Sequence, residues 1–311
     1  MRRRRWWSTV AGGLGALVLV AGCGGGASPP RPLANGDYQL AAAALYVEVA
    51  PAGARVVDVH LPGGANLLTG PSTDPVDFGS TFWTSPQSLW LWPPPDSFDT
   101  APFAVSGSDA SLAFTGPVNA DFGMQVAKRF TAGAAGGVVH VEYRITSAAG
   151  DGTYAPWEIT RVGPGGLTFY PTGADAPRAG GGFALPPTTT AAGCTWYQHP
   201  GSAPGVDQKL LADGAGGWLA HVTGDVVLIK TFADVPLGLA APHEAEIEIF
   251  VDGRGRYVEV EEQGAYQTVP DGQTLSWPVT WIVAALPPGL AASAGSADLV
   301  AYVQSLVSME L

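Results

Sequence analysis

The sequence has few basic residues: 15 Lys and Arg stand against 27 Asp and Glu in 311 residues, giving a formal net charge of −12. Three of the basic residues are lysines, Lys128, Lys209 and Lys230. Because a nucleic-acid surface needs clustered Lys and Arg, we expect no nucleic acid among the partners. Charged residues make up 14% of the chain and hydrophobic residues 46%, which excludes a disordered protein and allows a large core.

Long hydrophobic runs are also lacking, since the longest spans residues 10–20, too short to cross about 30 Å of hydrocarbon as a helix. This run follows Arg2 to Arg5 and ends in Val20-Ala21-Gly22-Cys23. Such a pattern is typical of a secretory signal with a lipobox, in which the Cys becomes the lipidated N-terminus. We therefore expect a signal peptide over residues 1–22, an acyl anchor such as palmitate on Cys23, and a Gly- and Pro-rich tether over residues 23–36.

These segments predict a lipoprotein of the bacterial cell envelope, anchored to a membrane on the exported side, at the outer membrane or cell surface. Removal of residues 1–22 takes away four Arg and no acidic residue, so the net charge falls from −12 to −16. The exported domain is therefore strongly acidic.

Cysteine is nearly absent: Cys194 is the sole Cys besides Cys23, which excludes a disulfide framework. Because no base adjoins Cys194, we expect a buried and unreactive thiol. Paired His and Cys at zinc spacing are missing, and Gly180-Gly181-Gly182 lacks the helix and Lys of a phosphate loop. We expect neither a metal nor a cofactor.

Glycine and proline are abundant, at 42 and 27 residues, and both disfavour helix interiors. From residue 37 onward, short β-prone runs alternate with turns, and many have period two. The runs span residues 43–49, 55–61, 124–130, 138–146, 154–162, 167–170, 195–198, 218–222, 226–232, 246–251, 257–262 and 276–284. They predict an all-β fold, a large β-sandwich over residues 37–311 without an interior linker.

The C-terminal segment breaks this pattern. Val300, Val303, Leu306 and Val307 have helical spacing, and Ser296 suits the N-cap, which predicts a short helix over residues 296–308. We expect its apolar stripe to close one edge of the sandwich. It lacks a basic face, which argues against membrane contact by this helix.

Residues 78–95 carry the densest chemical signal. Trp83, Trp90 and Trp92 lie within ten residues, together with hydroxyl side chains and Gln87, and prolines bracket them. The segment is too rich in Pro to be an interior strand. Aromatic faces beside short polar groups suit sugars, and the alternative is that these rings cover the end of the sandwich as a loop core.

Several segments resemble known proteins. Residues 45–61, followed by Gly63-Gly64-Ala65-Asn66-Leu67-Leu68, look like the opening of galactose mutarotase-like domains. Further segments resemble an uncharacterised bacterial lipoprotein family of that superfamily, also called aldose 1-epimerase-like: residues 82–87, 155–162, 257–266 and 270–277. The likeness spans roughly residues 37–287. It implies a galactose mutarotase-like β-supersandwich and a carbohydrate ligand.

Mutarotases use a carboxylate base and a His acid, and the resemblance places Glu261 near the position of the base. The alternative for Glu261 is a solvated strand face shared with Glu259 and Gln263. The Asn-His motif of mutarotases is replaced by Trp157-Glu158-Ile159-Thr160. Glu158 would serve as the acid if burial raises its pKa. Arg161 would fill the role of the pocket arginine by binding hydroxyls or an acidic sugar.

Three hypotheses follow. In the first, a monomeric envelope lipoprotein binds saccharide without catalysis, in a cleft formed by Trp83, Gln87, Trp90, Trp92, Trp157 and Arg161. In the second, it is an aldose epimerase with Glu261 as base and with Glu158 or an unidentified His as acid. In the third, it is a structural envelope protein whose aromatic loop docks a protein partner.

The anchor can be tested directly. The Cys23→Ser variant should move from the membrane fraction to the soluble fraction, because it lacks the thiol that carries the lipid. Cell fractionation measures this, with Cys194→Ser as the matched control that stays with membranes. Retention of Cys23→Ser in the membrane fraction would contradict the prediction.

Overall fold

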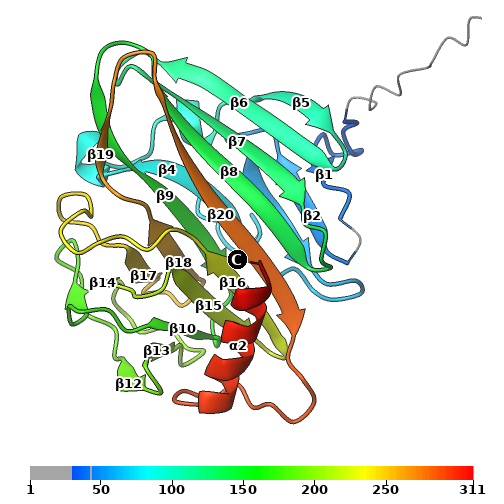
Figure 1. Ribbon diagram of the computed structural model, residues 1–311, viewed down its shortest axis with the longest axis vertical. Helices are drawn as coiled ribbons and strands as arrows, with labels where there is room; N and C mark the ends of the chain where they lie inside the picture. The colour runs from blue at the N-terminus through cyan, green and yellow to red at the C-terminus, as the bar shows by residue number, and fades with distance from the viewer. Residues whose placement is uncertain (1–29, 43, 311) are drawn as a thin grey trace, which may run out of the picture.

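Two ten-stranded antiparallel sheets pack face to face and form the body of the protein (Figure 1). The computed structural model describes residues 30–42 and 44–310, so the expected signal peptide and Cys23 lie outside the described residues. The all-β sandwich and its C-terminal helix are confirmed. Within the described residues, no helix is both long and apolar enough to span a membrane.

The outer face of the first sheet carries the cleft described below. Its strands are, in spatial order, β1 (Tyr38–Gln39), β2 (Tyr46–Ala50), β3 (Arg55–His60), β4 (Ser80–Ser85), β9 (Gly152–Val162), β18 (Val258–Gln263), β17 (Ile247–Val251), β14 (Gln208–Ala212) and β11 (Arg178–Ala179), with β19 (Gln267–Val269) paired to β9. A 3-10 turn, η1 (Gln87–Leu89), and a short helix, α1 (Asp96–Asp99), follow β4.

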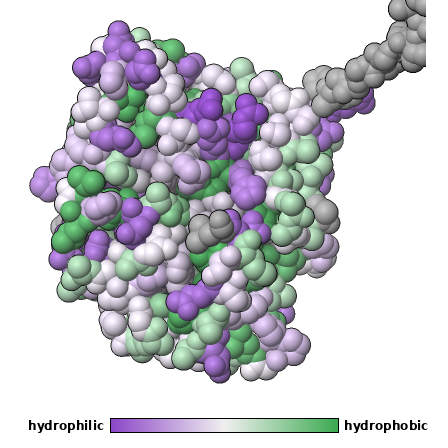
Figure 2. All heavy atoms as spheres, in the orientation of Figure 1, coloured by the Kyte–Doolittle hydropathy of each residue, from purple (hydrophilic) through white to green (hydrophobic). Residues whose placement is uncertain are grey.

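The second sheet packs against the inner face of the first. Its strands are, in spatial order, β12 (Thr189–Ala191), β13 (Cys194–Gln198), β10 (Leu167–Pro171), β15 (Trp218–Thr223), β16 (Val226–Thr231), β20 (Thr274–Ala285), β8 (Val138–Ser147), β7 (Met124–Ala132), β6 (Ser111–Asn119) and β5 (Ala104–Ser108). Hydrophilic side chains lie over β7 and β8 on the outward face of this sheet, as their period-two pattern predicts (Figure 2).

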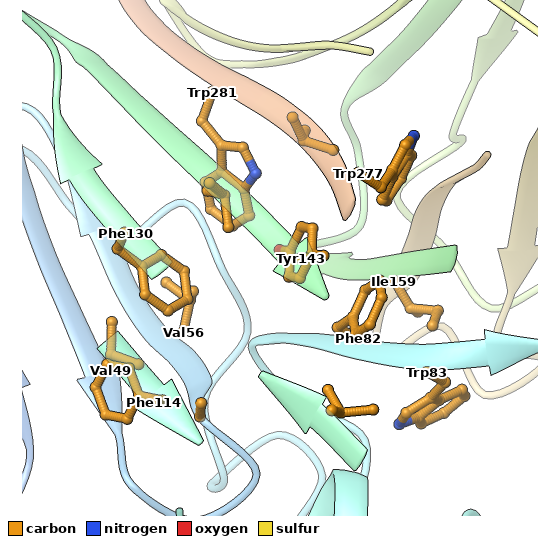
Figure 3. Close-up of a cluster of buried hydrophobic side chains, with 14 of the residues drawn as sticks. Val49, Val56, Phe82, Trp83, Phe114, Phe130, Tyr143, Ile159, Trp277 and Trp281 are labelled. Carbon is orange, nitrogen blue, oxygen red and sulfur yellow. The ribbon is translucent and has the colours of Figure 1, made fainter. Parts of the chain in front are cut away.

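The core lies between the sheets. Phe82 of β4 stacks on Tyr143 of β8 with ring centroids 4.2 Å apart, and Trp277 of β20 lies beside them. Figure 3 shows Phe82 and its neighbour Trp83 on opposite sides of β4. This alternation sends every second residue of the first sheet into the core and the others outward.

Helix α2 (Ala297–Glu310) covers the outer face of the second sheet, which differs from the expected position at an edge (Figure 1). Its buried Leu299 and Val303 belong to one cluster with Phe169 and Trp196 of the sheet. The helix takes this position because β10 and β13 present aromatic rings outward, and the apolar stripe buries them. Ser296 caps the helix, since its Oγ accepts a hydrogen bond from the Leu299 N–H.

The expectation that residues 78–95 contain no interior strand is wrong. β4 lies between β3 and β9 and is fully buried. The strand Ser80–Ser85 contains no proline, because the prolines begin at Pro86, where the chain leaves the sheet. The high proline content of residues 78–95 comes from the part of the segment that follows β4. Proline therefore restricts those later residues and not β4 itself.

A buried charged triad connects the sheets. Lys230 of β16 donates hydrogen bonds to Glu158 and Thr160 of β9, and its Nζ lies 3.3 Å from Glu262 of β18. The lysine and both glutamates are buried, and the ammonium also lies 4.5 Å from the Trp281 ring centroid. Burial raises the pKa of Glu262 well above its ordinary value, and the neighbouring Glu158 adds to this. This shift favours the uncharged form of Glu262, which reduces the negative charge buried in the triad.

Removing the ammonium should therefore destabilise the fold strongly. We expect Lys230→Met to lower the free energy of unfolding by about 3–5 kcal/mol, because a buried carboxylate loses its partner. Urea denaturation measures this. The control Arg144→Met breaks the exposed ion pair with Glu142 and should cost less than about 1 kcal/mol. Equal losses in the two variants would contradict the role of the triad.

Candidate functional site

A cleft of about 730 Å³ opens on the outer face of the first sheet, away from the second sheet. Its floor is built by strand register, with Trp83 of β4 directly opposite Trp157 of β9. A second row crosses the sheet on the same face and consists of Arg161, Glu259, Phe250 and Lys209. Loops after β4, β11 and β17 complete the walls. Residues far apart in the sequence therefore meet at one site.

Trp83 is the centre of an aromatic cluster. Its ring lies edge-on to Trp90, Trp92 and Trp157, at centroid distances of 5.6, 6.0 and 5.6 Å. The Trp83 Nε1–H donates to Asp99 at 2.9 Å, and Asp99 in turn pairs with Arg55 at 3.1 Å. Edge-to-face contacts and bonded indole N–H groups fix the rings in place, so the aromatic floor is formed before any ligand binds.

The structure brings four of the six predicted saccharide-binding residues to the cleft: Trp83, Gln87, Trp92 and Trp157. Trp92 is 55% exposed and forms an open platform at the rim. Trp90 does not line the cleft, because it packs on Phe98 and donates to the Thr84 carbonyl at 2.8 Å. Trp90 is therefore part of the core of the loop, which was the alternative to sugar binding for these rings.

Arg161 lies beneath the cleft instead of lining it. Its side chain is 1% exposed, and its guanidinium donates to Glu259 at 2.8 Å and to Thr81 at 3.0 Å. The Nη2 atom lies 3.7 Å from Asp77, and the guanidinium lies 5.3 Å from the Trp83 ring. Arg161 thus orients two carboxylates of the cleft, and its burial leaves no open side for an acidic sugar.

Glu261 faces the same side of the sheet but is 0% exposed. Lys209 Nζ lies 2.7 and 2.9 Å from its two oxygens, and Trp157 Nε1 donates to one of them at 2.9 Å. Lys209 also lies 2.7 Å from Glu248. Lys209 and Trp157 both line the cleft, so they cover the carboxylate that the resemblance pairs with the mutarotase base.

Glu158 and Glu261 do not share a site. Along β9, Trp157 faces the cleft and Glu158 faces the core, where it binds Lys230 of the second sheet. Glu158 lies opposite Glu262, whereas Glu261 lies opposite Ile159. The hypothesis of a Glu158 and Glu261 acid–base pair is therefore wrong in its geometry, because the sheet separates the two carboxyl groups.

Sequence reasoning missed several cleft residues. Lys209 comes from β14, which was not among the predicted strands, and Asp77 comes from the loop before β4. The hairpin after β17 contributes Arg254 and Arg256, although Asp252-Gly253-Arg254-Gly255 reads as a plain turn. The sequence did offer a signal for Glu259, because it lies two residues before Glu261 and the period of a strand places both on one face.

The hairpin is held tightly against the body. Arg256 forms a bidentate ion pair with Asp252 and a further one with Asp74. Gly255 has a φ of +72°, and a Cβ there would lie 2.8 Å from the backbone of Ala203. Glycine is therefore required at this close approach, which fixes the hairpin beside the cleft.

Acidic groups dominate the electrostatics. Burial raises the pKa of Glu259 to about 7, with Glu261 adding to the shift and Arg161 opposing it. Burial likewise raises the pKa of Asp77. Five acidic residues and three basic residues line the cleft: Asp77, Asp207, Glu244, Asp252 and Glu259, with Lys209, Arg254 and Arg256. Lys209 and Arg256 already pair with carboxylates, and the exposed Arg254 of the hairpin forms no ion pair with a described residue, so acidic groups outnumber the available cations of the cleft.

Known proteins were compared with this chain at the levels of sequence and structure. No protein-family model matches the sequence, and no curated protein matches it. A galactose mutarotase-like protein from Lactobacillus casei aligns with a TM-score of 0.53 and 13% identity, over 80% of this chain and 100% of that one. The chain has the galactose mutarotase-like fold.

Two further structures agree. A proposed aldose 1-epimerase from Escherichia coli has a TM-score of 0.54 and 14% identity, over 80% of this chain and 99% of that one. An aldose epimerase homologue from C. elegans has a TM-score of 0.50 and 8% identity, over 81% of this chain and 100% of that one. At such identities the likeness establishes the mutarotase-like fold, and membership of a lipoprotein family stays a prediction.

The raised pKa of Glu259 predicts a dependence of stability on pH. Between its ordinary value near 4.5 and about 7, the folded protein binds a proton on Glu259 that the unfolded chain does not. Stability therefore falls as pH rises through this window. Asp74 and Asp252, whose pKa values are lowered, act at more acidic pH.

We expect Glu259→Gln to reduce this fall in the free energy of unfolding by about 1–3 kcal/mol. Urea denaturation at pH 4.5 and pH 8 measures it. Glu310→Gln, at the end of α2, is the control that keeps the full pH dependence. An unchanged pH dependence in Glu259→Gln would refute the assignment.

Proposed function

We propose that this protein is a lipid-anchored, non-catalytic saccharide-binding protein of the bacterial envelope. The observation that carries the proposal is the combination, on one sheet face, of an open aromatic cleft and a sealed Glu261. Saccharide binding requires an open cleft, whereas epimerisation requires a carboxylate that can reach the substrate.

The chemistry of the cleft suits a sugar. Trp92, which is 55% exposed, offers ring surface against which the C–H face of a pyranose packs, and the nearly buried Trp83 and Trp157 form the floor beneath it. Gln87 and Asp207 stand at the walls and supply donors and acceptors for hydroxyl groups. A mostly apolar floor with a few directed polar groups is the usual design of a small-molecule site.

The sealed carboxylate argues against catalysis. A general base must come within about 2.6–3.2 Å of the proton that it removes. Both oxygens of Glu261 accept hydrogen bonds from Lys209, and one of them also accepts a hydrogen bond from Trp157 Nε1. A substrate would have to displace these two side chains to reach the carboxylate. Glu158 lies on the other side of the sheet and offers no acid to the same ligand.

The charges of the cleft favour an uncharged saccharide. Asp77 and Glu259 stand at its surface, and Arg161 is buried beneath them. An acidic sugar would bring a third negative charge to these two carboxylates, and the lining cation without an ion pair, Arg254, lies on the hairpin at the wall and not on this floor. The cell-envelope location rests on the sequence of residues 1–36, in which Cys23 carries the anchor.

Glycan binding tests this function. A soluble panel of malto-, cello-, manno-, xylo- and chito-oligosaccharides of one to six units should contain a ligand measurable by calorimetry. Trp92→Ala should weaken its binding about tenfold, or ~1.4 kcal/mol, because it removes the exposed ring at the rim. Val118→Ala, which truncates an exposed residue of β6 outside the cleft, should leave the affinity unchanged.

Two results would contradict the proposal. Equal affinities of wild type and Trp92→Ala would remove the site assignment. Mutarotation of fresh aldoses above the buffer rate, measured by polarimetry and abolished in Glu261→Gln, would instead favour the aldose epimerase.

A further inference from the structure

A second hollow, of about 470 Å³, adjoins the cleft. The two share His243 and Glu244 as a common wall, which we call the ridge. They also share strands, since Leu211 of β14 lines the cleft and the next residues of that strand and its loop, Ala212 and Asp213, line the hollow. The second hollow therefore continues the cleft along the edge of the first sheet.

The ridge is fixed from both sides. Glu244 accepts a hydrogen bond on its side chain from the Gln87 N–H of the cleft at 3.0 Å. Its backbone carbonyl accepts one from Arg178, which lines the second hollow, at 3.0 Å. A ligand crossing the ridge would meet a preformed surface and would not have to order a loop.

The segment leading to the ridge is anchored as well. Glu246 is buried, and its carboxylate accepts hydrogen bonds from the backbone N–H groups of Gly214 at 2.8 Å and Val235 at 2.9 Å. The Leu239 carbonyl accepts another from Tyr266 at 2.8 Å. These bonds keep the wall of the second hollow, residues 235–246, in one position.

The size of the combined space exceeds what one sugar needs. Drug-sized ligands fill pockets of about 300–1,000 Å³, and a single hexose is much smaller than such a ligand. The cleft and the second hollow each fall within this range, and they adjoin at the ridge. A chain of linked glycosyl units fits this shape, whereas a monosaccharide would leave most of it filled with water.

The two hollows differ in chemistry. The cleft has a tryptophan floor, whereas the second hollow has no aromatic residue in its lining. It offers Asp175, Arg178 and Asp213 for hydroxyl groups, beside the exposed aliphatic side chain of Leu237. Stacking in the cleft would supply most of the affinity, and hydrogen bonding beyond the ridge would add a smaller increment.

We propose that the second hollow is an accessory subsite and that the ligand is an oligosaccharide whose chain crosses the ridge of His243 and Glu244. This inference rests on the proposed saccharide-binding function. It assigns the ligand class as a glycan chain of several units.

The experiment measures affinity against chain length, using the series of the panel that binds, from one to six units. In the wild type, affinity should rise at least tenfold from the shortest to the longest member. Ala176→Trp places a large ring in the second hollow from an exposed position, so it should leave folding and the binding of the shortest ligand unchanged. It should remove the gain with chain length.

Ala292→Trp, at an exposed position that lines neither hollow, is the matched control and should keep the full gain. Persistence of the gain in Ala176→Trp, or affinity independent of length in the wild type, overturns the accessory subsite while leaving saccharide binding intact. Absence of binding across the whole panel overturns the proposed function together with this inference.

Discussion

The structure depends on how it buries positive charge between negative ones. Lys128 and Lys230 are buried, and the side chain of the third lysine, Lys209, is 12% exposed. Lys230 joins Glu158 and Glu262 between the sheets, and Lys209 joins two glutamates on the outer face of the first sheet. These ion pairs constrain the central strands β9 and β18, whereas Lys128 donates to the backbone carbonyls of Gly53 and Ala54.

The same interactions decide what the cleft can do. Lys209 stabilises the buried Glu261 and at the same time occupies the oxygens that a sugar hydroxyl would need. Trp157 completes the cover with its indole N–H while offering its ring to the cleft. Glu261, Lys209 and Trp157 therefore form a rigid floor, and Trp92 is the exposed ring of the cleft.

Sequence periodicity predicted the sandwich and the C-terminal helix because alternation and helical spacing are local properties. It did not predict β4, whose boundary depends on where the prolines start. Trp83 and Trp92 were predicted because tryptophans are concentrated in one short segment. Lys209 was not predicted, because its position in the cleft arises from the register of β14 against β17 and of β17 against β18. Glu158 was misassigned because one residue of shift along a strand changes the face that a side chain occupies.

That sensitivity has a consequence for β18 itself. Glu261 and Glu262 are consecutive, and each meets its own lysine on its own side of the sheet. If β18 slipped by one residue against its neighbours, one glutamate would take the other's position, and the second glutamate would move to a position that no lysine faces. Misaligned pairing would thus leave one lysine without its β18 glutamate, so electrostatics as well as hydrophobicity selects the correct alignment of this strand.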